Sequence, residues 1–381
     1  TAILSLIDQE DSREICDRVF GSRLGFVKYV MPGFDLAKLA AEVFEQAPRV
    51  EGLILDKHGI FTFGETARQS YGRMIEFVSL AEDHIRSRPA VPTAKAALPH
   101  HLASAAEIAP LLRGAVAQDR GEGGFNRMVS DFRGDPGILD FVNRADLPRL
   151  ALAGVSTPDL SIRIKTGPMA LPPPDRDRLT DYRDVIDTQV AGFASSYRAY
   201  FEANAARCAD ARTMLDPMPR LTLVAGVGLF GHGPTMKDAR IAADLGEIWI
   251  ETVRDAERVG SFRPVGRSDL FDLEYWPLEQ AKLANAKRLP LTGQVAVVTG
   301  GAGAIGAATA AEFARAGGHL VVADIDLAAA TAAADRAGNN SIGLRCDVTD
   351  PASVAEMFGA AVGTFGGVDM VISNAGAAWQ G

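Results

Sequence analysis

The stretch "VVTGGAGAIG", residues 297–306, decides the fold class of the C-terminal part of the chain. It continues the uncharged, β-branched run "QVAVVT", which is typical of a strand buried on both faces of a parallel sheet. An alanine-rich helical stretch, residues 307–317, follows the glycine-rich turn. Glycines let the backbone approach a pyrophosphate closely, and a helix N-terminus offers amide donors and a positive dipole. The order strand, turn, helix therefore predicts a dinucleotide-binding unit of the Rossmann type.

The next predicted strand, "GHLVVAD", ends at Asp324, which lies 18 positions after Gly306. An acid about 20 residues beyond the glycine turn is expected to hold a ribose 2'-hydroxyl. A carboxylate there would repel a 2'-phosphate, so the sequence favours NAD over NADP. A glycine-rich turn without a ligand is the alternative, and the ordered series of strand, turn, helix, strand and acid argues against it.

Three motifs in this part resemble the short-chain dehydrogenase/reductase family: "TGGAGAIG", "DVTD" at 347–350 and "SNAG" at 373–376. Thr299, Gly300 and Gly306 match the family's glycine pattern, whereas Ala304 replaces its middle glycine, and the extra methyl would crowd the phosphates. By resemblance, Asp347 and Val348 flank the adenine. The cofactor site that the resemblance implies comprises Thr299, Gly300, Gly301, Gly303, Ala304, Ile305, Gly306, Asp324, Ile325, Asp347, Val348, Asn374, Ala375 and Gly376.

The chemistry of that family needs a tyrosine and a lysine in a YxxxK pair, with a serine earlier in the chain. None of these matches lies within residues 289–381, so the catalytic residues are expected beyond Gly381. Residues 289–381 are accordingly expected to form the first half of a doubly wound parallel sheet, with four strands.

Residues 1–90 alternate strand-like and helix-like stretches, an α/β pattern. The apolar runs at 2–8 and 25–30 predict strands. A helix is predicted over 35–47, with Asp35 as its N-cap, and residues 50–64 predict a buried strand, a turn and a second strand. A long helix is predicted over 65–88.

His58 stands beside Gly59 between two apolar strands. The stretch 53–78, together with "YVMPGFDLAKLAAEVF" at 29–44, resembles class II sugar-phosphate aldolases and their adducin relatives. In those aldolases an upstream HxH and a third histidine hold zinc, which leaves a position open for substrate oxygens and acts as a Lewis acid. The resemblance implies that His58 is a metal ligand and that the HxH and a proton-carrying carboxylate precede Thr1.

The middle block, residues 91–288, begins after a proline-rich break and contains a second glycine pattern. Gly226, Gly228 and Gly231 have GxGxxG spacing after a predicted strand, and Glu251 follows "IWI" as a possible ribose acid. A second nucleotide or phosphate site is one interpretation. Tight packing of a strand on a helix is the other, and it is favoured because residues 237–260 read as one continuous helix. His232 is the candidate polar residue of this region.

The middle stretches at 157–171, 226–245 and 271–283 are similar to the bacterial bifunctional rhamnulose-1-phosphate aldolase/lactaldehyde dehydrogenase family. Leu160 departs from that family, where a histidine is expected. The resemblance implies cleavage of rhamnulose 1-phosphate to dihydroxyacetone phosphate and lactaldehyde, followed by NAD-dependent oxidation of lactaldehyde. Because both ends look cut, this chain alone is expected to bind NAD weakly and to catalyse neither reaction.

Composition narrows the partners of the chain. A net charge of -9 and a pI near 5.3 argue against nucleic acid and anionic membranes. The sequence contains no apolar run of membrane-spanning length, and its three cysteines lack a CxxC spacing. A cytoplasmic protein with sugar-phosphate and aldehyde substrates is expected, and the resemblance implies a homo-oligomer.

Two alternatives to the bifunctional enzyme remain open at this point. In the first, the N-terminal part is a non-catalytic, adducin-like interaction module joined to a dehydrogenase. In the second, the dehydrogenase carries an unrelated N-terminal extension.

Overall fold

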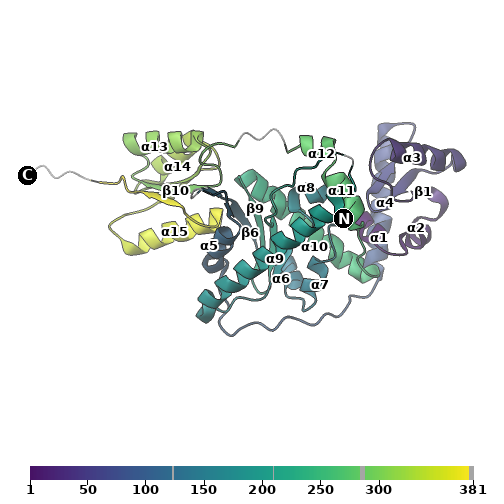
Figure 1. The fold of residues 1–381 in the computed structure, drawn as a ribbon, viewed down its shortest axis with the longest axis horizontal. Coiled ribbons are helices and arrows are strands. Elements are labelled where there is room, and N and C mark those ends of the chain that lie inside the picture. The colour runs from purple at the N-terminus through teal and green to yellow at the C-terminus, as the bar shows by residue number, and fades with distance from the viewer. Residues whose placement is uncertain (122–123, 209, 284–287, 377–381) are drawn as a thin grey trace, which may run out of the picture.

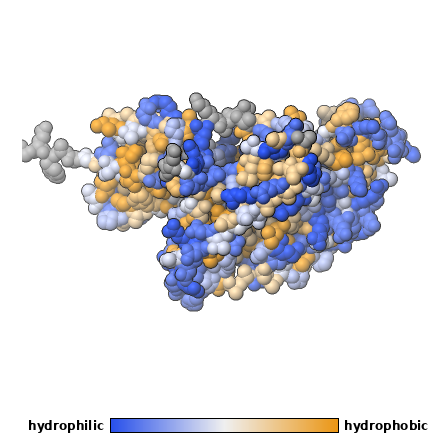
Figure 2. Space-filling model, viewed as in Figure 1, coloured by the Kyte–Doolittle hydropathy of each residue, from blue (hydrophilic) through white to orange (hydrophobic). Residues whose placement is uncertain are grey.

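The computed structural model describes residues 1–121, 124–208, 210–283 and 288–376. It is a mixed α/β structure in which three parts follow one another along the longest axis (Figure 1). Hydrophilic and hydrophobic residues are interspersed over the visible face of all three parts (Figure 2). None of the described helices combines the length and the apolar character that crossing a bilayer requires.

The N-terminal part is a small three-stranded sheet with helices around it. Its sheet has the order β1-β2-β3, with β1 and β2 parallel and β2 and β3 antiparallel. The antiparallel pair is the predicted strand–turn–strand unit of residues 50–64. The elements are α1 (Ala2–Ile7), α2 (Ser12–Phe20), β1 (Leu24–Val27), α3 (Phe34–Gln46), β2 (Gly52–Leu55), β3 (Gly59–Thr62) and α4 (Ala67–Ser87).

Two local predictions for this part are wrong. Residues 2–8 form helix α1, which packs against α4 and the middle-block helix α10 (Met236–Val259), rather than a strand. A short apolar run suits a buried helix as well as a strand, so tertiary packing decides between them. Helix α3 begins at Phe34 after the N-cap Gly33, so Asp35 lies inside the first turn. Its carboxylate still meets the positive end of the helix dipole there.

The middle part contains a four-stranded sheet of order β6-β9-β8-β7. Helix α10 packs against β6 and β9 and buries Trp249 in the main core of this part. The remaining helices surround the sheet. The elements are α5 (Ala105–Ala115), β4 (Gln118–Asp119), β5 (Phe125–Asn126), β6 (Val129–Arg133), α6 (Pro136–Val142), α7 (Leu147–Ala151), α8 (Ser161–Ile164), β7 (Met169–Leu171), α9 (Leu179–Ala205), β8 (Leu221–Val224), β9 (Gly228–Gly233), α10, α11 (Arg267–Glu274) and α12 (Pro277–Ala281).

The second glycine pattern belongs to a β-hairpin, which corrects its interpretation as a nucleotide fingerprint. Gly226 lies in the turn between β8 and β9, and its φ of 81° suits glycine. A Cβ on Gly231 would lie 2.3 Å from the carbonyl oxygen of Ala239 in α10. Glu251 is an exposed residue within α10 and does not follow a strand. Gly231 therefore serves close strand–helix packing, the interpretation that the continuous helix favoured, whereas Gly226 belongs to the hairpin turn.

The C-terminal part is a parallel sheet of order β12-β11-β10-β13 with helices on both faces. Alternate residues of β10 and β11 point to opposite faces. One face packs on α15 and on β6 and α10 of the middle part, and the other packs on α13 and α14. This is the expected half of a doubly wound sheet. The elements are β10 (Val295–Thr299), α13 (Ala304–Arg315), β11 (His319–Asp324), α14 (Leu327–Ala337), β12 (Ile342–Arg345), α15 (Pro351–Phe365) and β13 (Met370–Ile372).

Candidate functional site

A cleft of about 570 Å³ lies at the carboxyl ends of the four parallel strands. This edge is where ligands bind in open α/β sheets, at the point where strand order reverses on either side of the first strand. Here β11 and β13 flank β10 on opposite sides, so the reversal lies directly beyond Thr299. The cleft therefore lies where open α/β sheets of this kind bind nucleotides.

The turn after β10 tolerates no side chain at its two key glycines. Gly300 has a φ of 60°, and a Cβ on it would lie 2.9 Å from the Cα of Ala375. A Cβ on Gly306 would lie 2.4 Å from the carbonyl oxygen of Gly300. Ala304, which replaces a family glycine, is the first residue of α13 and has no positive φ. The backbone there accommodates an L-residue without strain.

The start of α13 supplies the positive end of the site. Gly303 is its N-cap without a side chain, so no side-chain oxygen occupies the first amide groups of this twelve-residue helix. Those amide groups have no partner within the helix, which makes its N-terminus suitable for an anion. Gly303, Ala304, Ile305 and Gly306 all line the cleft.

Asp324 is the last residue of β11 and its carboxylate is hydrogen-bonded to the glycine turn. Its carboxylate accepts a hydrogen bond from the Ala302 amide at 3.0 Å and another from the Asp326 amide at 3.2 Å. The Asp324 side chain is only partly buried and lines the cleft. The residue thus combines a structural contact with an available carboxylate at the position expected for a ribose hydroxyl.

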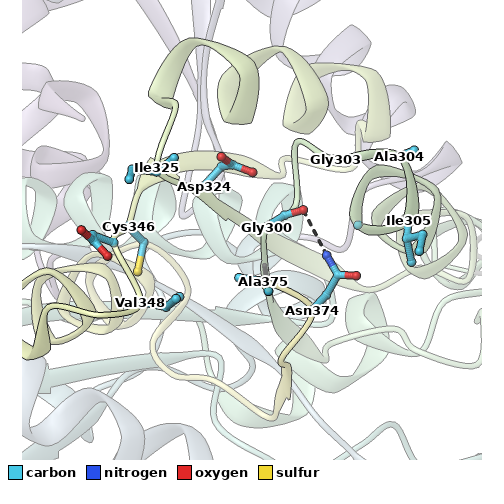
Figure 3. Close-up of a pocket in the computed structure, with 13 residues that line it drawn as sticks. Gly300, Gly303, Ala304, Ile305, Asp324, Ile325, Cys346, Val348, Asn374 and Ala375 are labelled. Carbon is cyan, nitrogen blue, oxygen red and sulfur yellow. Dashed lines mark hydrogen bonds between the residues drawn. The ribbon is translucent and has the colours of Figure 1, made fainter. Parts of the chain in front are cut away.

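The "NAG" turn ties β13 to the end of β10. The side-chain amide of Asn374 donates to the carbonyl oxygen of Thr299 at 3.0 Å and to that of Gly300 at 3.1 Å, and Figure 3 shows the bond to Gly300. The Thr299 hydroxyl oxygen accepts from the backbone amides of Asn374 and Ala375, each at 3.1 Å. These bonds hold the glycine turn against the neighbouring strand and shape the floor of the cleft.

The side of the cleft beyond β11 and β12 is partly apolar. Ile325 and Val348 are 62% and 47% exposed, although both are aliphatic, and they lie on the same side of the cleft (Figure 3). Asp347 next to them accepts from the amide and the hydroxyl of Thr349, and these bonds hold the pKa of its carboxyl below the usual value. Exposed aliphatic faces beside an ionised carboxylate suit a planar, amino-bearing base.

The structure brings together all the predicted cofactor residues except two. Thr299 and Gly301 do not line the cleft. Thr299 acts through its hydrogen bonds to the "NAG" turn, and a Cβ on Gly301 would lie 2.6 Å from Val322. Cys346 lines the cleft and was not predicted. The only sequence signal for it is its position directly before Asp347, and burial raises the pKa of its thiol.

His58 lies in the tight turn between β2 and β3, and its environment is only partly that of a metal ligand. Its Nε2 lies 3.8 Å from the Asp159 carboxylate, and its Nδ1 is buried without a hydrogen-bond partner among the described residues. Within the described ranges, no three His, Cys, Asp or Glu side chains are grouped closely enough to hold a metal ion. The described residues therefore do not make a complete metal site. His58 is a single imidazole with an unpaired ring nitrogen.

The other histidines have structural partners or solvent around them. His232 is fully buried, with the Ser130 hydroxyl 2.9 Å from its Nδ1 and the Thr222 hydroxyl 2.9 Å from its Nε2. Burial and the nearby Arg220 lower its pKa from 6.5 to about 3. His101 is exposed and pairs with Asp177.

Three family models match the chain in succession. The "Class II Aldolase and Adducin N-terminal domain" matches residues 2–85, "Aldolase class II, second domain" matches 103–283, and "short chain dehydrogenase" matches 294–381. The first two matches exclude an unrelated N-terminal extension, whereas the first does not separate an aldolase from an adducin-like module.

Individual known proteins are also similar to this chain. The uncharacterized oxidoreductase YuxG of Bacillus subtilis is 30% identical over 99% of this chain, which covers 55% of that protein. The (+)-borneol dehydrogenase 1 of Salvia officinalis is 45% identical over 23% of this chain and 33% of its own length. A solved hydroxysteroid dehydrogenase from Escherichia coli is 34% identical with a TM-score of 0.22, over 22% of this chain and 37% of that one.

The chain thus spans about half of YuxG and about a third of the plant dehydrogenase. Its matched regions account for nearly all the described residues, and their order agrees with the three parts of the structure. This is a mixed α/β protein in which class II aldolase domains and a short-chain dehydrogenase domain are joined in one polypeptide.

Proposed function

We propose that this chain is part of a fused enzyme that cleaves a ketose 1-phosphate and oxidises the aldehyde product with NAD. The observation that carries the redox half is the cleft at the strand ends, where the glycine turn, Asp324 and the "NAG" turn converge. NAD, when bound, supplies the hydride acceptor for the oxidation. The chain's own contribution is to bind and orient that cofactor.

Each part of the cleft has a role in this proposal. The glycines Gly300 and Gly306 and the amide groups at the start of α13 would hold the pyrophosphate, because added side chains there would collide with the turn. The Asp324 carboxylate would accept from the ribose hydroxyls, and its charge would disfavour a 2'-phosphate. Ile325 and Val348, with Asp347 nearby, would hold the adenine.

Calorimetric titration of this chain with NAD, NADP and ATP tests the redox half. Weak binding of NAD, with NADP weaker still, is expected from Asp324. A chain that binds ATP as well as NAD and shows no preference against NADP would contradict the proposed site, because the contacts would then be to phosphate alone.

For the lyase half, we propose rhamnulose 1-phosphate as substrate, with dihydroxyacetone phosphate and lactaldehyde as products and with His58 as one ligand of a divalent ion, zinc. The two class II aldolase matches and the unpaired Nδ1 of His58 support this role. Further ligands would have to come from outside the described residues. In an aldolase the metal supplies Lewis acidity.

The test of the lyase half uses the fused enzyme that we propose. His58→Ala should lower bound zinc below one ion per chain and abolish aldol cleavage, while NAD binding is retained. His101→Ala is the matched control, because His101 is exposed and pairs only with Asp177. Full zinc content and cleavage in His58→Ala would show that His58 is not a zinc ligand. Absence of both zinc and cleavage in the unmodified enzyme would favour the second candidate, a non-catalytic adducin-like module fused to the dehydrogenase.

A further inference from the structure

A second cleft, of about 490 Å³, lies in the middle part, at the ends of α8, β9 and α12 and at the start of α10. It is separate from the cleft of the parallel sheet and contains none of the residues assigned above to NAD or metal. The charged residues lining it are five cations and two carboxylates: Arg163, Lys165, Arg220, Lys237 and Lys282, with Asp216 and Asp238. This excess of positive charge contrasts with the net charge of -9 of the whole chain.

Three of the five cations already have carboxylate partners. The pairs are Arg220 with Asp216 at 2.7 Å, Arg163 with Asp238 at 3.7 Å, and Lys282 with Glu279 at 2.5 Å. Lys165 and Lys237 have no ion pair and no side-chain hydrogen bond among the residues that the structure describes. Both of these lysines line the cleft, Lys165 as a buried residue and Lys237 as an exposed one, and neither ammonium group has a direct anionic partner among the described residues.

Lys165 is in an unusual environment for a lysine. Only 4% of the residue is exposed, and its ammonium nitrogen lies 4.9 Å from the centre of the Tyr197 ring. Glu274, a buried acid whose charge acts on Lys165, already accepts hydrogen bonds from Tyr197 and Tyr200 at 2.6 and 3.0 Å. Burial, and then Arg220, lower the pKa of Lys165 to about 8. An ammonium group buried without a hydrogen-bonded anion destabilises the protein.

The backbone at Lys165 adds a second cost. Its φ of 63° and ψ of -149° lie at the border of a region that glycine adopts readily and other residues rarely adopt. Such a conformation costs on the order of 1–3 kcal/mol in a non-glycine residue. Strain and an unpaired charge thus coincide in one residue whose side chain lines the cleft. The Tyr197 ring and the charges of Glu274 and Asp216 offset part of the cost of the charge, but none of them gives the ammonium group a hydrogen bond.

We propose that this cleft binds a phosphate-bearing anion, with Lys165 and Lys237 as its direct cationic contacts. A phosphate would offer acceptor oxygens to both ammonium groups, and charge-assisted hydrogen bonds of this kind are among the strongest in proteins. His232 also borders the cleft, but its two ring nitrogens are engaged by Ser130 and Thr222, so it contributes no charge. The assignment does not depend on aldol cleavage or on NAD.

Calorimetric titration of the chain with inorganic phosphate and with dihydroxyacetone phosphate tests this assignment. Lys165→Met and Lys237→Gln should each weaken phosphate binding by about tenfold or more, because each removes one charge-assisted hydrogen bond. Lys38→Gln, which removes an exposed lysine on α3, should leave the affinity unchanged. Equal affinity for both probes assigns the site to the phosphate ion, and affinity at least tenfold higher for dihydroxyacetone phosphate assigns it to a phosphorylated carbonyl compound.

Lys165→Gly separates a binding role from a structural one. Glycine removes the buried charge and suits the backbone, so this variant should lose phosphate binding while its midpoint of thermal unfolding stays level or rises. Unchanged phosphate affinity in Lys165→Met and in Lys237→Gln would overturn the proposal. A second combination of results would also overturn the proposal: a lower midpoint of thermal unfolding in Lys165→Gly together with unchanged phosphate affinity in Lys237→Gln. Lys165 would then have a structural role only.

Discussion

Arg113 of α5 and Asp369 at the entrance to β13 form a buried ion pair, with Nη2 and Oδ2 2.5 Å apart. Their side chains are 7% and 11% exposed, and the pair joins the middle part to the parallel sheet. Arg113 also donates to the carbonyl oxygens of Met128 and Gly293 at 2.7 and 2.8 Å. Asp369 accepts from the Val295 amide at 2.7 Å, at the start of the central strand. The pair therefore fixes the dehydrogenase sheet to its neighbour.

Asp369→Ala should lower the free energy of unfolding by about 3–5 kcal/mol, because it leaves the Arg113 charge buried without its partner. Urea denaturation measures this loss. Arg86→Gln is the control, because it breaks an exposed pair with Glu82 on α4, and such pairs contribute about 1 kcal/mol or less. Equal losses in the two variants would show that the buried pair contributes no more to the free energy of unfolding than a surface pair does.

Gly306→Ala should abolish detectable NAD binding, because its Cβ would lie 2.4 Å from the carbonyl oxygen of Gly300 and force the turn open. Calorimetric titration with NAD gives the readout. Gly359→Ala in α15 is the matched control, since a Cβ there meets nothing within 4 Å and alanine favours helix. Retention of NAD affinity by Gly306→Ala would mean that the cofactor does not use this turn.

Asp324→Ser should reduce the preference for NAD over NADP by about tenfold. The variant removes the repulsion between the Asp324 carboxylate and a 2'-phosphate, and a repulsion energy of about 1.4 kcal/mol corresponds to a tenfold change in the ratio of the two dissociation constants. The Ala302 amide donates to the Asp324 carboxylate, and a serine hydroxyl at this position can also accept a hydrogen bond. Asp326→Ser is the control, because Asp326 caps α14 and does not line the cleft. An unaltered ratio in Asp324→Ser would show that the carboxylate does not face the 2'-position.

The parallel sheet and its cleft could be predicted from the sequence because their signals are local. Each signal can be recognised without knowledge of distant residues: the run "QVAVVT" predicts a buried strand, the glycines predict a tight turn, and Asp324 ends the next strand. The resemblance to known dehydrogenases supplied the "DVTD" and "NAG" positions. Cys346 was missed because nothing in its immediate sequence distinguishes a buried thiol beside a cleft from one in a core.

The wrong or missing predictions concern segments whose structure depends on contacts between residues far apart in the sequence. Helix α1 has the composition of a strand and is helical because α4 and α10 cover it. Gly226, Gly228 and Gly231 have the spacing of a nucleotide turn, but Gly226 and Gly228 lie at the β8–β9 hairpin turn and Gly231 allows the close approach of α10. The environment of Lys165 depends on Tyr197, Glu274 and Arg220, which are far from it in sequence. No pattern around residue 165 could reveal that its charge is unpaired.

His232 should make the folded state lose stability as the pH falls. Its pKa is about 3 in the folded state and 6.5 ordinarily, so between these values the unfolded chain binds a proton that the folded chain does not. The stability contribution is therefore complete above pH 6.5 and declines as the pH falls toward 3. Between pH 7 and pH 5 the loss from this residue is about 2 kcal/mol, at roughly 1.4 kcal/mol per pH unit below the ordinary value.

Urea denaturation of the wild type and of His232→Gln at both pH values isolates this contribution, because other titrating groups are common to the two proteins. The wild type should lose about 2 kcal/mol more than the variant between pH 7 and pH 5. The exposed His101 provides the comparison, since His101→Gln leaves the buried imidazole and its Ser130 and Thr222 contacts intact. Parallel losses in wild type and His232→Gln would mean that the imidazole takes up its proton inside the folded protein, which the two hydroxyl contacts and full burial argue against.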